Sequence, residues 1–233
     1  MKQGVQNLKS RRSVMTGMGI ATAGLAVGAA ACAQTPAARG SATGFQPERH
    51  DVDSWFDELP GEHRVFIDTS YPRGGAEALL YANNLYAAQE SAYAGGPADF
   101  AMVVCFRHFS TPFGYVDSVW QKYGEGFNEI MQYPDPATGQ APRINLMNSP
   151  DHPTLPNFGF TIDSHVARGT QFAICDNATH FFAGQLANAA GTSQEDVYAE
   201  LVAGAIPNSR FVSAGVMAMT RAQEYGYSLL YAG

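Results

Sequence analysis

The stretch Ala-Met-Val-Val-Cys-Phe at residues 101–106 decides the fold, because every one of its six positions is apolar. A strand with one wet face alternates polar and apolar residues, whereas an unbroken apolar run suits a strand buried on both faces. Such burial is typical of a parallel sheet that is covered by helices on either side. We expect two further strands of the same sheet at residues 63–68 and 170–175, which carry the runs Val-Phe-Ile and Phe-Ala-Ile-Cys.

Helical and extended patterns alternate on both sides of that strand. Apolar spacing and capping signals predict strands at 209–212 and 227–231, and helices at 76–93, 113–123, 161–168, 178–190, 194–205 and 216–225. Five strands separated by helices indicate an α/β fold. We expect an open, doubly wound, mostly parallel five-stranded sheet with flavodoxin-like layering and right-handed crossovers.

The N-terminal stretch is typical of an export signal. Paired arginines (Arg11 and Arg12) precede a mild apolar run at residues 15–31, and no acidic residue occurs before Glu48. This pattern predicts a twin-arginine signal peptide over residues 1–33, and therefore a periplasmic protein. Cys32 has two interpretations, as part of an ordinary cleavage region or as a lipidated N-terminus. The run is short and rich in glycine, so we expect no transmembrane span in the mature protein.

Three further segments follow the signal. Residues 34–60 are predicted to be a flexible leader with a short helix near 51–59, docked by Trp55 and Phe56. Residues 61–233 are predicted to form the α/β domain. A segment at about 131–160, rich in Pro, Asn, Asp and Gly, is predicted to be an insertion, and long loops in compact domains are often functional.

The chain is acidic, with 14 basic and 21 acidic residues and a net charge of −7. Removal of the signal takes away four basic residues and no acidic ones, so the mature net charge falls to −11. Such a surface argues against nucleic acid and anionic membranes as partners. Beyond Cys32 only Cys105 and Cys175 remain, too few for a disulfide framework.

Ligands of open α/β sheets bind at the carboxyl ends of the strands, and three predicted strand ends carry notable residues. The first strand is followed by Gly74 and Gly75 at the start of a helix, a phosphate cradle or a plain turn. The second is followed by Arg107 and His108, which are suited to hold an anion or to keep a thiol ionised. The third ends at Cys175.

Cys175 is the residue that we single out as a nucleophile. It lies just before a predicted helix, where free amides and the helix dipole favour a thiolate able to carry sulfur. Asp176 opposes this through its negative charge, and the alternative for Cys175 is a small buried residue. Asp176, Asn177 and His180 follow Cys175 just before or within that helix and are further binding candidates.

Cys105 lies inside its strand, where a cysteine is usually part of the core. A flavodoxin-like strand order, 2-1-3-4-5, places the first strand between Cys105 and Cys175. Their backbones are then roughly 9–10 Å apart, beyond the reach of a disulfide. Cys175, His108 and His180 are a candidate metal group, but no CxxC or HExxH motif accompanies them. We therefore predict no cofactor, with a metal or haem as the alternative.

Three segments carry a resemblance to a known family. They are V-V-C-F-R-H-F-S-T-P-F (103–113), A-R-G-T-Q-F-A-I-C-D-N-A-T (167–179) and A-G-V-M-A-M-T-R-A-Q-E-Y-G-Y-S-L-L-Y (214–231). With the order of elements, they make residues 63–233 resemble the DsrE/DsrF-like sulfur-relay proteins. The resemblance implies a doubly wound fold, a sulfur-accepting cysteine at Cys175, and homo- or hetero-oligomers. The insertion and the export signal depart from the cytoplasmic relay members and indicate an exported branch.

Two functions remain open from the sequence. The first is a periplasmic persulfide carrier, or thiol-dependent handler of small anions, that uses Cys175 and has a sulfur-donor or sulfur-acceptor protein as partner. The second is a non-catalytic ligand-, metal- or haem-binding module, or an assembly module, that uses the same strand-end pocket. The sequence leaves open whether the protein is an enzyme.

Overall fold

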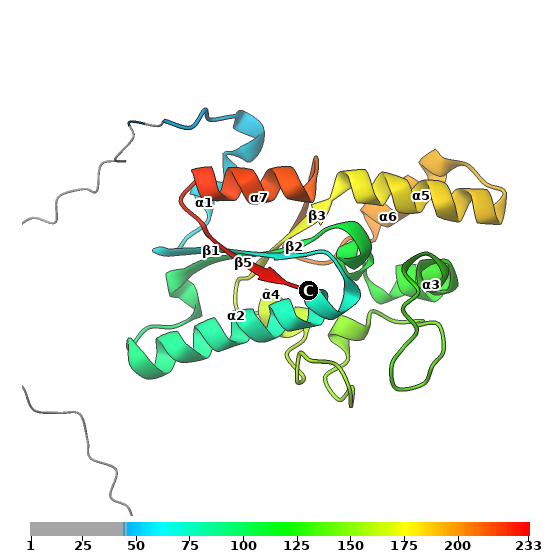
Figure 1. The fold of residues 1–233 in the computed structure, drawn as a ribbon, viewed down its shortest axis with the longest axis horizontal. Helices are drawn as coiled ribbons and strands as arrows, with labels where there is room; N and C mark the ends of the chain where they lie inside the picture. The colour runs from blue at the N-terminus through cyan, green and yellow to red at the C-terminus, as the bar shows by residue number, and fades with distance from the viewer. Residues whose placement is uncertain (1–43, 45) are drawn as a thin grey trace, which may run out of the picture. The chain divides into compact units, whose positions relative to one another are not determined.

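The computed structural model describes residue 44 and residues 46–233. The predicted twin-arginine signal, Cys32 and the first part of the predicted leader lie outside the described residues. Residues 47–233 form one compact unit, which includes the short helical segment before the first strand (Figure 1).

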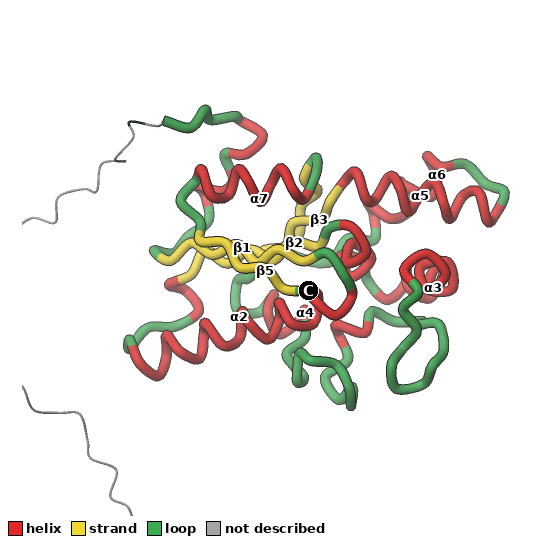
Figure 2. Tube along the Cα trace, in the orientation of Figure 1, coloured by secondary structure: helices red, strands yellow, loops and turns green. Residues whose placement is uncertain are grey.

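Five strands form the central sheet, as the apolar runs predict. They are β1 (His63–Thr69), β2 (Phe100–Phe106), β3 (Gln171–Cys175), β4 (Ser209–Val212) and β5 (Ser228–Ala232). The strand order is β4-β3-β2-β1-β5, and every neighbouring pair is parallel. Helices cover both faces, which confirms the predicted open, doubly wound α/β fold (Figure 2).

The strand order differs from the flavodoxin-like one, and the expectation that β1 separates the two cysteine strands was wrong. β2 and β3 are direct neighbours, with Cys105 opposite Ala173. Cys175 lies two residues further along β3, on the same face of the sheet, which puts the two Cα atoms roughly 8 Å apart. This diagonal is still too long for a disulfide, and both cysteines are free.

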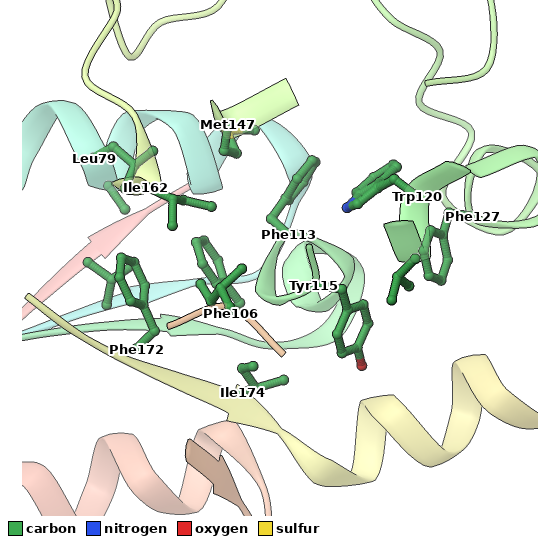
Figure 3. Close-up of a cluster of buried hydrophobic side chains, with 14 of the residues drawn as sticks. Leu79, Phe106, Phe113, Tyr115, Trp120, Phe127, Met147, Ile162, Phe172 and Ile174 are labelled. Carbon is green, nitrogen blue, oxygen red and sulfur yellow. The ribbon is translucent and has the colours of Figure 1, made fainter. Parts of the chain in front are cut away.

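The direction of the connections explains which helices cover which face. The connections β1 to β2, β2 to β3 and β3 to β4 each move to the next strand in the same direction across the sheet. Right-handed crossovers in one direction place their helices on one face. The helices of this face are α2 (Pro72–Ala92), α3 (Asp117–Met131), α4 (Ile162–Val166), α5 (Asp176–Ala190) and α6 (Gln194–Ala203). They share an aromatic core, part of which Figure 3 shows around Phe106, Phe113 and Phe172.

The last connection steps back across the sheet from β4 to β5, so its helix α7 (Gly215–Glu224) covers the opposite face. The short helix α1 (Trp55–Glu58) packs beside α7 in a second core, as its predicted docking through Trp55 and Phe56 requires. The Tyr227 hydroxyl donates to the Phe56 carbonyl at 2.8 Å and ties this helix to the end of the chain.

Short 3₁₀ segments complete the secondary structure: η1 (Asp51–Asp53), η2 (Pro97–Asp99), η3 (His108–Gly114) and η4 (Leu146–Asn148). The helix predicted at 113–123 instead begins at Asp117 and runs to Met131, because η3 occupies the residues after β2. The Ser110 hydroxyl sits in the turn of η3, where it accepts from the Arg107 amide at 3.0 Å and meets the Thr69 hydroxyl at 2.7 Å.

Loops and turns make up most of residues 132–161, with η4 as the regular helical turn. Buried Asn145 anchors this segment, since its side-chain amide donates to the carbonyls of Phe113 and Tyr115, both at 2.8 Å. In the part of the chain that the structure describes, no helix is both long and apolar enough to cross a membrane.

Candidate functional site

The sheet has a topological switch point between β3 and β4. The chain leaves β3 toward α5 on one face and leaves β4 toward α7 on the other, so a crevice opens between the two strand ends. A cavity of about 340 Å³ lies there. It is lined by the end of β3, by the segments that follow β2 and β4, and by the starts of α5 and α7. The lining residues are Arg107, His108, Phe109, Cys175, Asn177, Ala178, Phe181, Ala214, Gly215 and Val216.

Cys175 lies where the sequence places it, as the last residue of β3 and the N-cap of α5. It lines the cavity and keeps 7 % of its surface exposed. Its thiol makes no capping hydrogen bond, while its carbonyl accepts from the Thr179 hydroxyl at 3.0 Å. Cys175 therefore lines the cavity at the N-terminal end of a 15-residue helix, next to the first backbone amides of that helix.

The structure directs Asp176 and His180 away from the cavity, toward α6. The Tyr198 hydroxyl donates to the Asp176 carboxylate at 2.7 Å, and the His180 ring lies 3.6 Å from that carboxylate and stacks on Tyr198. The Asp176 hydrogen bond is the main reason that the pKa of Tyr198 is raised. The negative charge next to Cys175 is thus held by Tyr198 on α6 and lies near His180 on α5, and neither Asp176 nor His180 lines the cavity.

Arg107 reaches the cavity as predicted, but its charge has a partner. Its guanidinium donates twice to Asp68, at 2.7 Å from both Nε and Nη2, and the Asp68 carboxylate is 1 % exposed. This hydrogen bonding is the first cause of a raised pKa for Arg107. A guanidinium has five N–H donors, so three remain for a ligand, while the net charge of the pair is zero.

Gly215, the first residue of α7, allows Arg107 to lie at the switch point. A Cβ atom on Gly215 would lie 2.5 Å from the Cβ and 2.9 Å from the Cδ of Arg107. The start of α7 thus contacts the Arg107 side chain, and it lines the same cavity as the start of α5. The Asn177 amide is already bound to the Ser213 carbonyl at 3.3 Å, which links the two strand-end loops.

His108 lines the cavity and packs against two aromatic rings, those of Phe109 and Tyr71. Its φ of 52° lies in the left-handed region, and its ring stacks on Phe109 at 4.1 Å between centroids. The Tyr71 ring meets it edge-on at 5.5 Å. His108 therefore forms part of an exposed aromatic wall.

Gly74 and Gly75 lie outside the cavity and serve packing. A Cβ on Gly74 would lie 2.3 Å from the Ala232 carbonyl oxygen, so this glycine lets α2 approach the end of β5. The Gly75 amide donates to the Tyr71 carbonyl at 3.1 Å, and the residue faces the Phe113 ring. The structure does not bring these two glycines together with Cys175.

Cys105 is fully buried in the second core, as expected of a cysteine inside a strand. Burial, followed by the nearby Asp68 carboxylate, raises the pKa of the Cys105 thiol well above its usual value. Of the two cysteines in the described residues, Cys175 is the one that lines a cavity.

Two parts of the cavity were not predicted from the sequence: the wall that α7 contributes and the apolar side chain of Phe181. A signal for the first was present, because Ser-Ala-Gly at 213–215 follows a predicted strand and opens a predicted helix. In residues 46–233, no three His, Cys, Asp or Glu side chains gather as a metal site, so the candidate group of Cys175, His108 and His180 is not assembled there.

No protein-family model matches this chain, and a search of the curated proteins found no match.

Proposed function

We propose that this protein is a DsrE-like carrier of sulfane sulfur, exported to the periplasm, with Cys175 as the sulfur acceptor. The observation that carries the proposal is the position of Cys175 at the N-cap of α5, inside a cavity of about 340 Å³ at the switch point of the sheet. Buried cysteines that serve packing alone do not need a cavity, whereas a carrier needs a thiol that a small molecule reaches.

The transfer is a thiol–persulfide exchange. The Cys175 thiolate attacks the outer sulfur of a donor persulfide, R–S–SH, so that a new S–S bond forms and the S–S bond of the donor breaks. The electron pair of the broken bond leaves with the donor as R–S⁻, and the proton stays on the transferred sulfur, which gives Cys175–S–SH. The step needs no external oxidant or reductant.

Other residues of the cavity hold the donor. The three free N–H groups of Arg107 and the first amides of α7 suit an anionic group, and Asn177 lies beside Cys175 on the first turn of α5. Asp68 acts through Arg107 by fixing its guanidinium, and is a positioning residue.

The test is the mass of the intact protein before and after incubation with a panel of persulfide donors. We expect the wild type and a Cys105→Ala variant to gain one sulfur atom, and a Cys175→Ser variant to gain none. A failure of the wild type to gain sulfur from any donor, while iodoacetamide still alkylates Cys175, would rule the proposal out.

A second candidate is a binding module that uses the same cavity without sulfur transfer. Two observations favour it: the Asp68–Arg107 pair leaves the cavity without net charge from Arg107, and Cys175 keeps only 7 % of its surface exposed. Ligand binding that survives in the Cys175→Ser variant, together with no sulfur gain in the wild type, identifies this module. The metal or haem version requires metal or a visible absorbance in protein purified from its host.

The proposed carrier works as an oligomer with a donor or acceptor protein as partner. Tyr71 and Tyr231 are exposed large side chains at the carboxyl end of the sheet and are the residues that we propose for contacts. Sedimentation of the wild type and of a Tyr231→Ala variant measures this directly. A wild type that sediments as a monomer at all concentrations contradicts the oligomer.

A further inference from the structure

We infer that the donor is an organic persulfide, a small molecule with an apolar body and one anionic group, in preference to thiosulfate or inorganic polysulfide. This inference rests on the proposed function and names the substrate class of the same cavity. Three independent properties of the cavity support it: its volume, its walls and its charge.

The cavity is too large for an inorganic donor. At about 30 Å³ for each molecule of liquid water, a cavity of about 340 Å³ holds about ten waters. Pockets of 300 Å³ and more typically hold organic ligands that fill most of the space. Thiosulfate has only a few heavy atoms and would leave much of this cavity filled with water.

The walls are mainly apolar and are open to solvent. Phe181 and Val216 stand on opposite sides, on α5 and α7, and are 47 % and 53 % exposed. Ala178 and Ala214 line the cavity beside them, and Phe109 adds an aromatic ring from the β2 side. An inorganic anion gains nothing from these side chains, whereas an apolar body that covers them removes apolar surface from water.

The charge of the cavity suits one anionic group and disfavours a dianion. Asp68 neutralises Arg107 through two hydrogen bonds of 2.7 Å, and the chain as a whole carries a net charge of −7. A dianion therefore meets little net attraction. A single carboxylate is satisfied by hydrogen bonds from the remaining N–H groups of Arg107 and from the start of α7.

In the complex that this geometry implies, the carboxylate lies at Arg107 and the apolar body lies between Phe181 and Val216. The outer sulfur of the persulfide then meets Cys175. Exchange proceeds as written above: the new S–S bond forms at Cys175, and the organic thiolate leaves with the electron pair of the old bond.

The first experiment compares sulfur transfer to Cys175 from the persulfide of a carboxybenzyl thiol with transfer from thiosulfate and from inorganic polysulfide at equal concentration. We expect transfer from the organic donor to be at least tenfold faster. Phe181→Ala and Val216→Ala should each lower the ratio of organic to inorganic rates about three- to tenfold, because each removes apolar surface from the wall. Phe158→Ala, which removes an exposed aromatic side chain outside the cavity, should leave the ratio unchanged.

The second experiment needs no sulfur transfer. A sulfur-free aromatic carboxylate such as phenylacetate should slow the alkylation of Cys175 by iodoacetamide at least tenfold at saturation, whereas sulfate at the same concentration should not. The Phe181→Ala variant should need a several-fold higher concentration of phenylacetate for the same protection.

The outcomes separate this inference from the proposed function. Equal transfer rates from all donors, or ratios unaffected by Phe181→Ala and Val216→Ala, overturn the inference and leave the carrier in place. Transfer from no donor contradicts the carrier itself, and the inference with it. If Phe181→Ala instead turns a sedimenting dimer into a monomer, the apolar wall is an interface between copies of the chain, and the inference is wrong.

Discussion

Asp68 and Gly215 determine what Arg107 does at the cavity. Asp68 fixes two of its N–H groups, and Gly215 leaves the space that the aliphatic part of the side chain fills. An arginine at a strand end with no such partner would be a strong anion site. Here the same residue is a hydrogen-bond donor with its charge compensated, and in the proposed carrier hydrogen bonding and apolar contact, rather than net charge, would select the donor.

Gly215→Ala tests this arrangement. The new Cβ would lie 2.5 Å from the Cβ of Arg107, so Arg107 or the start of α7 must move. We expect the free energy of unfolding in urea to fall by about 1–3 kcal/mol. Gly96→Ala is the matched control, because a Cβ there meets nothing within 4 Å. Equal stability of the two variants would show that Arg107 yields without cost.

His165 on α4 gives a second prediction at this scale. It is fully buried, and neither ring nitrogen has a hydrogen-bond partner within the described residues. Burial, aided by the nearby Arg168 charge, lowers the pKa of His165 from 6.5 to about 4. As the pH falls, His165 is therefore protonated in the unfolded chain before it is protonated in the folded protein.

Protonation of His165 therefore leaves the free energy of unfolding unchanged above about pH 6.5. Between pH 6.5 and pH 4 it lowers that free energy progressively, by about 3 kcal/mol in total. Urea unfolding between pH 7 and pH 4 measures the loss. A His165→Leu variant should lose less stability over this range than the wild type. The same loss in both proteins would place the effect elsewhere.

At the scale of elements, the sequence predicted what the elements are but not how they neighbour one another. Unbroken apolar runs predicted β2 and β3, because a strand that is buried on both faces is apolar at nearly every position of its own sequence. The order of the strands has no such local sequence pattern. The expected flavodoxin-like order was therefore wrong, and the adjacency of β2 and β3 was not predicted. The wall from α7 was missed for the same reason, since only the step from β4 back to β5 brings Gly215 to Arg107.

Of the candidate residues near Cys175, some line the cavity as the sequence predicted and others do not. Arg107, His108 and Asn177 line the cavity, because strand ends of a parallel sheet share one edge. Asp176 and His180 do not, because Tyr198 on α6 binds that carboxylate, and no local pattern predicts a partner 22 residues away.

The short helix α1 gives the prediction at the element scale. Phe56 is fully buried against the rings of Phe66, Tyr225 and Tyr227, so the segment before β1 forms part of the second core. We expect Phe56→Ala to lower the free energy of unfolding by about 3–5 kcal/mol, measured in urea. Exposed Val52→Ala is the control and should change stability little. A small effect of Phe56→Ala would mean that this helix is dispensable.

At the scale of the whole molecule, the proposed export bears on how the fold protects its two cysteines. An oxidising compartment threatens a free cysteine, and the two cysteines of the domain respond differently. Cys105 is buried in the core and its thiol has a raised pKa, whereas Cys175 is mostly covered but lines a cavity. The fold thus leaves one thiol open to small molecules.

The decisive measurement is the loading and discharge of Cys175, followed by mass spectrometry of the peptide that contains it. We expect this peptide to gain one sulfur atom from an organic persulfide and to lose it when an acceptor thiol is added, while the Cys105 peptide stays unchanged. If the Cys175 peptide gains no sulfur although its thiol is alkylated readily, or if the sulfur appears on Cys105, the account of Cys175 as a sulfur carrier is contradicted.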